Sequence, residues 1–286
     1  MSTVRNWTVL AAVLFLSLFV YSQLRSASTS SSQVNCYHTS EPVKAVPESH
    51  LQSVPDLSYD QIYLFGDSLT DFAIKPGGWV NRLTVAYSRK ADVVNRGVSA
   101  LNSWNLRYLV PSFLRESPPN RIKLITILIG TNDFSISSFW THVDLDVYKE
   151  NLNILFHCQI LVMTPPPMST RSWKDGAYLI ENAVIYRDAC IETVTSLQQS
   201  MENVELLNLW DLFVPNGEYK QKDWNPSSVK KFFYDDGLMK AITTRWPELN
   251  PENMPHKLPF PHEFPVANSK DVEGLKKVLF KEARKP

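Results

Sequence analysis

The sequence predicts a three-layer α/β domain, in which a five-stranded parallel sheet lies between helices. Five short apolar runs rich in β-branched residues recur from Asp60 onward, and segments with helical periodicity separate them. The first four runs end directly at Gly, Asn or Pro, as strands that enter a turn do. Such runs are typical of strands buried on both faces of a parallel sheet. They cover residues 62–65, 91–94, 123–129, 159–164 and 204–209.

The helices are predicted from apolar residues at helical spacing between these runs. The clearest covers residues 175–200, where four apolar residues share one face: Ile180, Val184, Ile191 and Val194. The alternation of strand and helix implies right-handed crossovers and one domain, residues 59–250, followed by a tail, residues 251–286. In such sheets ligands bind beyond the carboxyl ends of the strands.

One predicted connection is unusually short. A helix is expected from about Asp144 to Phe156, and the next strand begins near Gln159. Only His157 and Cys158 then separate them, with no Gly, Pro or Asn to end the helix. Connections of about 2–6 residues are usual, so this one lies at the lower limit.

Composition excludes several classes of protein. The 286 residues include 29 Lys+Arg and 29 Asp+Glu, so the chain lacks the basic field expected of a nucleic-acid binder. Hydrophobic residues make up 44% of the chain, which excludes a disordered or collagen-like protein. The three cysteines are odd in number and far apart, which excludes a disulfide scaffold, and no CxxC pair suggests zinc. Cys158 and Cys190 are expected to be buried small apolar residues.

The N-terminal segment, residues 1–25, is predicted to be an uncleaved signal-anchor helix or a signal peptide. No charge occurs between Asn6 and Leu24, but the apolar core is intermediate between a signal-peptide core and a full span. Cleavage after the small residues 26–28 is one alternative, and a helix inside the domain is another. The Ser- and Pro-rich residues 26–58 are expected to form a flexible tether. The predicted location is a membrane or the secretory pathway.

Candidate functional residues follow the predicted strands. Ser68 comes after the first strand, where a serine on a turn into a helix suits a nucleophile, although a helix N-cap serine is also common. Gly97 follows the second strand, where it permits close approach of a ligand or simply forms a turn. Asn132 follows the third strand and either donates to an oxyanion or forms an Asx turn. Asp236, near the end of the domain, either orients a base or lies in a solvated turn. Asp67, next to Ser68, is expected to lie at a helix start or bridge a loop as readily as to take part in catalysis.

In order and spacing, these blocks resemble the SGNH (GDSL-type) esterase family, whose fold is flavodoxin-like. Within that family the sequence is most similar to isoamyl acetate-hydrolysing esterases, over about Gln61 to Pro259. The resemblance implies that Ser68 is the nucleophile, that Gly97 and Asn132 donate to the oxyanion, and that Asp236 orients a histidine. It also implies small acetate-type esters as substrates and no metal or organic cofactor. The blocks that carry it are residues 66–69, 77–79, 89–97, 130–133, 148–152, 164–167 and 245–248.

The sequence departs from the family where the catalytic histidine is expected. The family has Asp-x-x-His, whereas residues 236–239 here are Asp-Gly-Leu-Met, so Met239 occupies the histidine position. A thioether cannot accept a proton at neutral pH. Relatives carry a longer segment here and also before Gln159, which suggests two deletions: a skipped exon, a gene-model error or a decayed copy. None of the six histidines is an evident replacement: His38, His50, His142, His157, His256 and His262.

Two functions follow from these observations. The first is a serine ester hydrolase that acts on small-molecule esters, by acyl-enzyme chemistry at Ser68. The second is a non-catalytic or truncated SGNH protein that keeps the pocket but lacks the base. A lipase that acts at the membrane holding the chain would differ from the first in substrate only.

Overall fold

All five predicted strands are present and form one parallel sheet in the computed structural model. The structure describes residues 58–115, 117, 119–153, 158–167, 176–214 and 237–257, all within a compact unit that spans Pro55–Pro286. The order across the sheet is β2-β1-β3-β4-β5, which confirms the predicted parallel sheet. The strands are β1 (Asp60–Gly66), β2 (Ala91–Gly97), β3 (Ile122–Leu128), β4 (Gln159–Met163) and β5 (Val204–Leu207).

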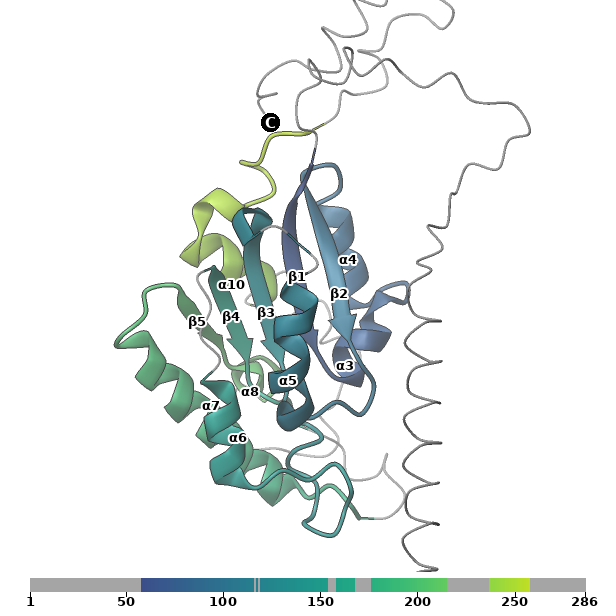
Figure 1. Ribbon diagram of the computed structural model, residues 1–286, viewed down its shortest axis with the longest axis vertical. Helices are drawn as coiled ribbons and strands as arrows, with labels where there is room; N and C mark the ends of the chain where they lie inside the picture. Colours follow the sequence, from purple (N-terminus) through teal and green to yellow (C-terminus); the bar gives the residue numbers. More distant parts are fainter. Residues whose placement is uncertain are drawn as a thin grey trace, which may run out of the picture. The chain divides into compact units, whose positions relative to one another are not determined.

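Helices cover both faces of the sheet, so the three-layer prediction is confirmed (Figure 1). One face packs against α5 (Ser103–Leu114), α6 (Leu145–Leu152) and α7 (Ile180–Gln198). The other packs against α4 (Trp79–Ala86) and α10 (Leu238–Arg245). The shorter helical segments are α3 (Ser68–Asp71), η1 (Phe72–Ile74), η2 (Pro119–Arg121), α8 (Leu209–Phe213) and η5 (Pro247–Leu249).

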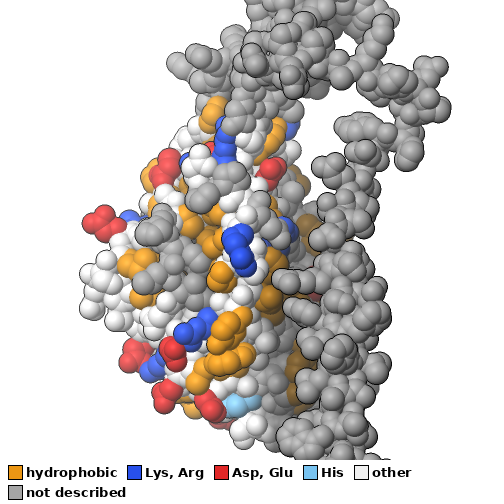
Figure 2. All heavy atoms as spheres, viewed as in Figure 1, with side chains coloured by type: hydrophobic (Ala, Val, Ile, Leu, Met, Phe, Trp, Pro, Cys, Tyr) orange, Lys and Arg blue, Asp and Glu red, His pale blue; other side chains and the backbone are white. Residues whose placement is uncertain are grey.

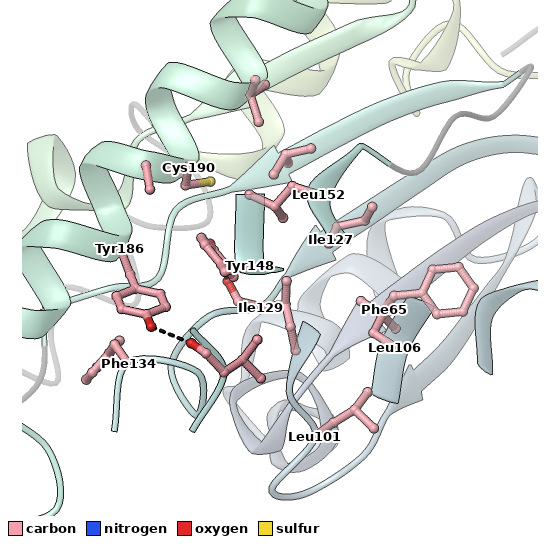
Figure 3. Close-up of a cluster of buried hydrophobic side chains, with 14 of the residues drawn as sticks. Phe65, Leu101, Leu106, Ile127, Ile129, Phe134, Tyr148, Leu152, Tyr186 and Cys190 are labelled. Carbon is pink, nitrogen blue, oxygen red and sulfur yellow. Dashed lines mark hydrogen bonds between the residues drawn. The ribbon is translucent and has the colours of Figure 1, made fainter. Parts of the chain in front are cut away.

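Alternating side chains of each strand face the two helical layers. In β1, Tyr63 and Phe65 belong to the cluster on the α5 side, whereas Ile62 and Leu64 belong to the cluster on the α4 side. Figure 3 shows the first cluster, where Tyr186 of α7 donates a hydrogen bond to the carbonyl of Val143. Burying one such large apolar side chain contributes roughly 1.5–3 kcal/mol, so both faces stabilise the sheet.

The helix before β4 is shorter than predicted. It ends at Leu152, and Asn153 is its C-cap, with ψ at 36° instead of the helical value. Residues 153–158 therefore separate α6 from β4, which is within the usual range for such a connection. The prediction that this helix runs to Phe156 and leaves only two linking residues was wrong, because Asn153 ends the helix four residues earlier.

The long helix α7 buries a stripe that matches the predicted one only in part. Val194 is buried as predicted, together with Ala183, Tyr186 and Cys190, whereas the predicted Ile180 and Val184 pack at the margin of this cluster. Cys190 is fully buried, as expected, whereas Cys158 is only partly buried. Burial raises the pKa of the Cys190 thiol to about 12, so this thiol stays protonated and unreactive at neutral pH.

Several predicted segments lie outside the described residues. They are the N-terminal hydrophobic helix of residues 1–25, nearly all of the tether of residues 26–58, and most of the tail of residues 251–286. Within the described ranges, no helix combines the length and hydrophobicity that crossing a bilayer requires.

Candidate active site

The candidate site lies where the winding of the sheet reverses. From β1 the chain adds β2 on one side and then crosses over to place β3 on the other side of β1. In doubly wound sheets of this order, the crevice beyond the carboxyl ends of β1 and β3 is the usual place for a ligand. Ser68 follows β1, Asn132 follows β3, and both line one cavity of about 580 Å³.

Ser68 is the first residue of α3 and is half-buried. The helix N-cap is Asp67, whose carboxylate accepts a hydrogen bond from the Leu69 N–H at 2.8 Å. The alternative prediction, that Ser68 itself caps the helix, was therefore wrong. Because Asp67 performs the capping, the Ser68 hydroxyl is not committed to the helix end. Among the described residues, none forms a hydrogen bond with this hydroxyl.

Asn132 is buried, with 6% of its surface exposed, and its side-chain amide is held at both ends. Its Nδ2 donates to the carbonyl of Leu101 at 2.8 Å, and its Oδ1 accepts from the Tyr178 hydroxyl at 3.1 Å. The Asn132 side chain therefore contacts distant segments instead of closing a local Asx turn. A primary amide has two N–H donors, so one remains for a ligand in the cavity.

A glycine lets the chain turn directly after β3. Gly130 has φ at +121°, and a Cβ at this position would lie 2.7 Å from the Tyr148 hydroxyl oxygen. The turn is followed by Asp133, which is fully buried and accepts hydrogen bonds from the Ser103 N–H at 2.9 and 3.1 Å. Asn132 belongs to the same loop as Asp133, and these contacts attach that loop to the start of α5.

The structure places Gly97 beside α3 instead of on the cavity wall. Its N–H donates to Asn95 Oδ1 at 2.9 Å, and a Cβ at Gly97 would lie 2.4 Å from the Asp71 nitrogen. Gly97 thus permits the close approach of α3 to β2. In the loop that follows β2, the residues that line the cavity are Ser99 and Ala100, and Ala100 has φ at +65°.

Two buried carboxyl groups lie beneath the site. Burial raises the pKa of Asp67 to about 7; the Leu69 N–H opposes this shift and the nearby Asp133 carboxylate adds to it. Burial also raises the pKa of Asp133 to about 7, and the hydrogen bonds from Ser103 oppose this shift. Both groups therefore change protonation near neutral pH, close to the residues that hold Ser68 and Asn132.

The structure does not bring a described histidine into the Ser68 cavity. His142 lines a neighbouring cavity, and its Nδ1 is 2.6 Å from the carbonyl oxygen of Ser135. His256 lies near Arg89 and Lys90, which precede β2, and thus at the opposite edge of the sheet. Burial, followed by the charges of Lys90 and Arg89, lowers the pKa of His256.

Met239, at the expected histidine position, does not line the Ser68 cavity. It lies in the first turn of α10, partly buried against the hydrophobic cluster on the α4 side. Leu238, beside it, is fully buried in the same cluster. Asp236 lies outside the described residues, so its predicted role stays a prediction.

Apolar side chains form most of the cavity wall, and two aromatic residues there were not anticipated from the sequence. Tyr178 precedes α7 and reaches the loop after β3, where Ile136 N–H donates to the Ala177 carbonyl at 2.8 Å. Trp140 belongs to the same loop and is 75% exposed. No local pattern marks either residue, because their roles arise from contacts between distant segments. The lining residues are Ser68, Leu69, Phe72, Ala73, Ser99, Ala100, Asn132, Phe139, Trp140, Thr141 and Tyr178.

Comparison with known proteins agrees with the resemblance seen in the sequence. The mouse isoamyl acetate-hydrolyzing esterase 1 homolog is 30% identical over 176 residues, which cover 54% of this chain and 69% of the relative. The isoamyl acetate-hydrolyzing esterase of Schizosaccharomyces pombe is 28% identical over 228 residues, covering 77% of this chain and 89% of the relative. The crystal structure of LAE5, an alpha/beta hydrolase from a lake metagenome, aligns with a TM-score of 0.48 at 16% identity, over 67% of this chain and 96% of that one.

A family model described as GDSL-like Lipase/Acylhydrolase matches residues 64–229, more than half of the chain. This match begins in β1 and includes Ser68, Gly97 and Asn132. This chain therefore belongs to the GDSL-like lipase/acylhydrolase family.

Proposed function

We propose that this protein is a serine carboxylic ester hydrolase that acts on small acetate-type esters at Ser68. One observation carries the proposal: Ser68 and Asn132 line the same cavity, at the switch point between β1 and β3. The mostly apolar wall of this cavity supports a small apolar acyl group at Ser68. The esterase names of the relatives support the same reaction class.

In the proposed reaction, the Ser68 oxygen attacks the ester carbonyl carbon, and the alcohol leaves with a proton. Water then attacks the acyl-enzyme and releases the carboxylic acid. Negative charge develops on the carbonyl oxygen in both steps. The second N–H of Asn132 and the backbone N–H of Ser68 are the proposed donors to this oxygen, and Gly97 is a third donor whose N–H is shared with Asn95.

The proton of Ser68 requires an acceptor, which the family supplies as a histidine held by an aspartate. Asp236 is the proposed aspartate. Because neither described histidine lines the cavity and Met239 packs against a hydrophobic cluster away from it, a second candidate function stands beside the first. In it, the protein keeps the ester-binding cavity but has little or no hydrolytic activity.

A fluorophosphonate probe separates these two functions. An esterase is expected to react rapidly and covalently at Ser68, and Ser68→Ala protein is expected not to react. Absence of labelling in wild-type protein that unfolds cooperatively would contradict the esterase and support the non-catalytic protein.

Exogenous imidazole gives a second measurement. If only the base is missing, imidazole in solution is expected to increase acetate-ester hydrolysis in wild-type protein beyond its effect in Ser68→Ala protein. An equal increase in both proteins would mean that Ser68 is not poised to attack.

Residues 1–25 are proposed, from the sequence, to direct the chain to a membrane or the secretory pathway, ahead of a hydrolase domain at residues 59–250. Expression of the chain with a C-terminal tag, followed by fractionation and N-terminal sequencing, tests both the location and any cleavage.

A further inference from the structure

A second cavity, of about 480 Å³, adjoins the Ser68 cavity. It is lined by residues of α5, of α6 and of the loop between β3 and α6. Trp140 lines both cavities, so the two share a wall. The lining residues are Asn102, Trp104, Asn105, Trp140, His142, Val143, Asp144 and Val147.

Two tryptophan side chains of this cavity are exposed although they are large and apolar. Trp104 is 47% exposed and Trp140 is 75% exposed. Neighbouring rings support both: Tyr108 lies edge-on to Trp104 at 5.2 Å between centroids, and Phe139 lies 6.1 Å from Trp140. Exposed aromatic side chains beside a cavity are typical of ligand sites.

One exposed carboxylate lines the cavity. Asp144, whose side chain is 84% exposed, is the only carboxylate among the lining residues, and none of them is Lys or Arg. Figure 2 shows hydrophobic, acidic and histidine side chains close together at the lower end of the visible surface.

The other polar groups of the cavity are already in use. Asn102 accepts from the Asn105 N–H at 2.9 Å and donates to the Thr141 carbonyl at 3.0 Å. Because a carbonyl can only accept, His142 donates through Nδ1 to Ser135, and its Nε2 lies 3.3 Å from Asp144 Oδ1.

We propose that this second cavity binds an organic cation of the quaternary ammonium type. The faces of Trp104 and Trp140 attract such a cation through their π electrons, and the Asp144 carboxylate attracts it through charge. Methyl groups on the cation cover the indole surface that is now exposed. If the proposed esterase function holds, the natural ester carries this cation on its alcohol, with the carbonyl at Ser68 and the cation beyond Trp140.

Choline and its uncharged isostere 3,3-dimethylbutan-1-ol test the proposal directly. The two differ in charge and are nearly equal in shape. Binding is followed by saturation-transfer NMR at constant ionic strength, with Ser68→Ala protein, so the result does not depend on catalysis. Choline is expected to bind about three- to tenfold more tightly than the isostere. Equal binding of the two, or no binding of choline, would overturn the proposal.

Substitutions identify the residues involved. Asp144→Asn and Trp104→Ala are each expected to weaken choline binding about three- to tenfold, and Trp104→Phe is expected to restore most of the affinity. The matched control is Asp146→Asn, which removes an equal, exposed charge from α6 but not from the cavity lining. Thermal melts establish that each variant is folded. If Asp146→Asn and Asp144→Asn weaken binding equally, the cation is attracted by general surface charge, and the proposed site is wrong.

Discussion

The two halves of the proposed catalytic site differ in what positions them. Ser68 and Asn132 follow neighbouring strands, and described hydrogen bonds fix the Asp67 cap and both ends of the Asn132 amide. The expected histidine position belongs to α10, where Met239 packs in the hydrophobic cluster. The half proposed to bind the ester carbonyl thus follows two neighbouring strands, whereas the proposed proton acceptor belongs to a segment outside them. We therefore expect that substitutions can separate ester binding from proton transfer in this protein.

The largest expected effect comes from placing a histidine where the family carries one. Inserting the His-bearing segment of a relative between Gly237 and Leu238 is expected to raise turnover by up to about 10⁶-fold, the cost of losing the histidine from a well-studied triad. Hydrolysis of a chromogenic acetate measures the increase. The same insertion with Ser68→Ala is the control and is expected to show no increase. If the insertion variant folds but its turnover does not rise, Ser68 cannot attack an ester in this protein.

Met239→His alone is expected to give no such increase, because residue 239 packs against the hydrophobic cluster on the α4 side and does not line the Ser68 cavity. A polar group partly buried there without a partner costs up to about 3 kcal/mol, so the urea midpoint is expected to fall. A large gain in turnover from this single change would show that the start of α10 reaches Ser68.

Asn132→Ala is expected to lower the labelling rate or turnover by about 10²–10³-fold, the usual cost of one oxyanion donor. Tyr178→Phe is expected to have a smaller effect of the same kind, because it removes the hydrogen bond that orients Asn132. In the Asn132→Ala background, Tyr178→Phe is expected to add little. Tyr186→Phe, which removes a buried hydroxyl that is bonded to Val143, is the control. If Tyr178→Phe costs as much in Asn132→Ala protein as in wild type, Tyr178 acts independently of Asn132.

Gly97→Ala is expected to lower the free energy of unfolding by about 1–3 kcal/mol, because the new Cβ would lie 2.4 Å from the Asp71 nitrogen and displace α3. Reactivity of Ser68 is expected to fall with it. Gly77→Ala is the comparison: Gly77 has φ at +84° with nothing within 4 Å, so a cost of about 1 kcal/mol is expected without loss of reactivity. Chemical denaturation and probe labelling measure the two quantities.

A further expected effect is a pH dependence of stability. The folded-state pKa of Asp133 is about 7, against about 3.9 in an unfolded chain, so the folded protein binds the proton more tightly. The stabilisation is complete below about pH 4 and is lost as the pH rises to about 7. Asp133→Asn is expected to reduce the fall of the urea midpoint over this range but not to abolish it, because Asp67 has a similarly raised pKa. Asp146→Asn is expected to leave the fall unchanged. A wild-type midpoint that rises between pH 4 and 7 would contradict the raised pKa.

Local pattern predicts most of the fold because four of the five strands are apolar runs that stop at a turn residue. The same regularity predicts which residues reach the carboxyl edge, including Ser68 and Asn132. The end of α6 was missed because Asn153, although polar and able to cap, lies in a stretch whose apolar spacing continues to Phe156. Tyr178 and Trp140 could not be predicted, since their positions depend on the pairing of the loop after β3 with the segment before α7. The pKa values of Asp67 and Asp133 likewise depend on burial, which appears only in three dimensions.

The strand order has one further consequence. Ser68 and Asn132 are far apart in the chain, but the strands that lead to them are hydrogen-bonded neighbours, held about 4.8 Å apart by backbone geometry that every sequence shares. Trp140 lies in the same loop as Asn132, eight residues further along and beyond the paired strands. We expect substitutions at Trp140 to change which ester fits the proposed site more than they change the strands that lead to Ser68 and Asn132. Relatives with this strand order are then expected to differ in substrate at such loop positions while the two strands stay paired.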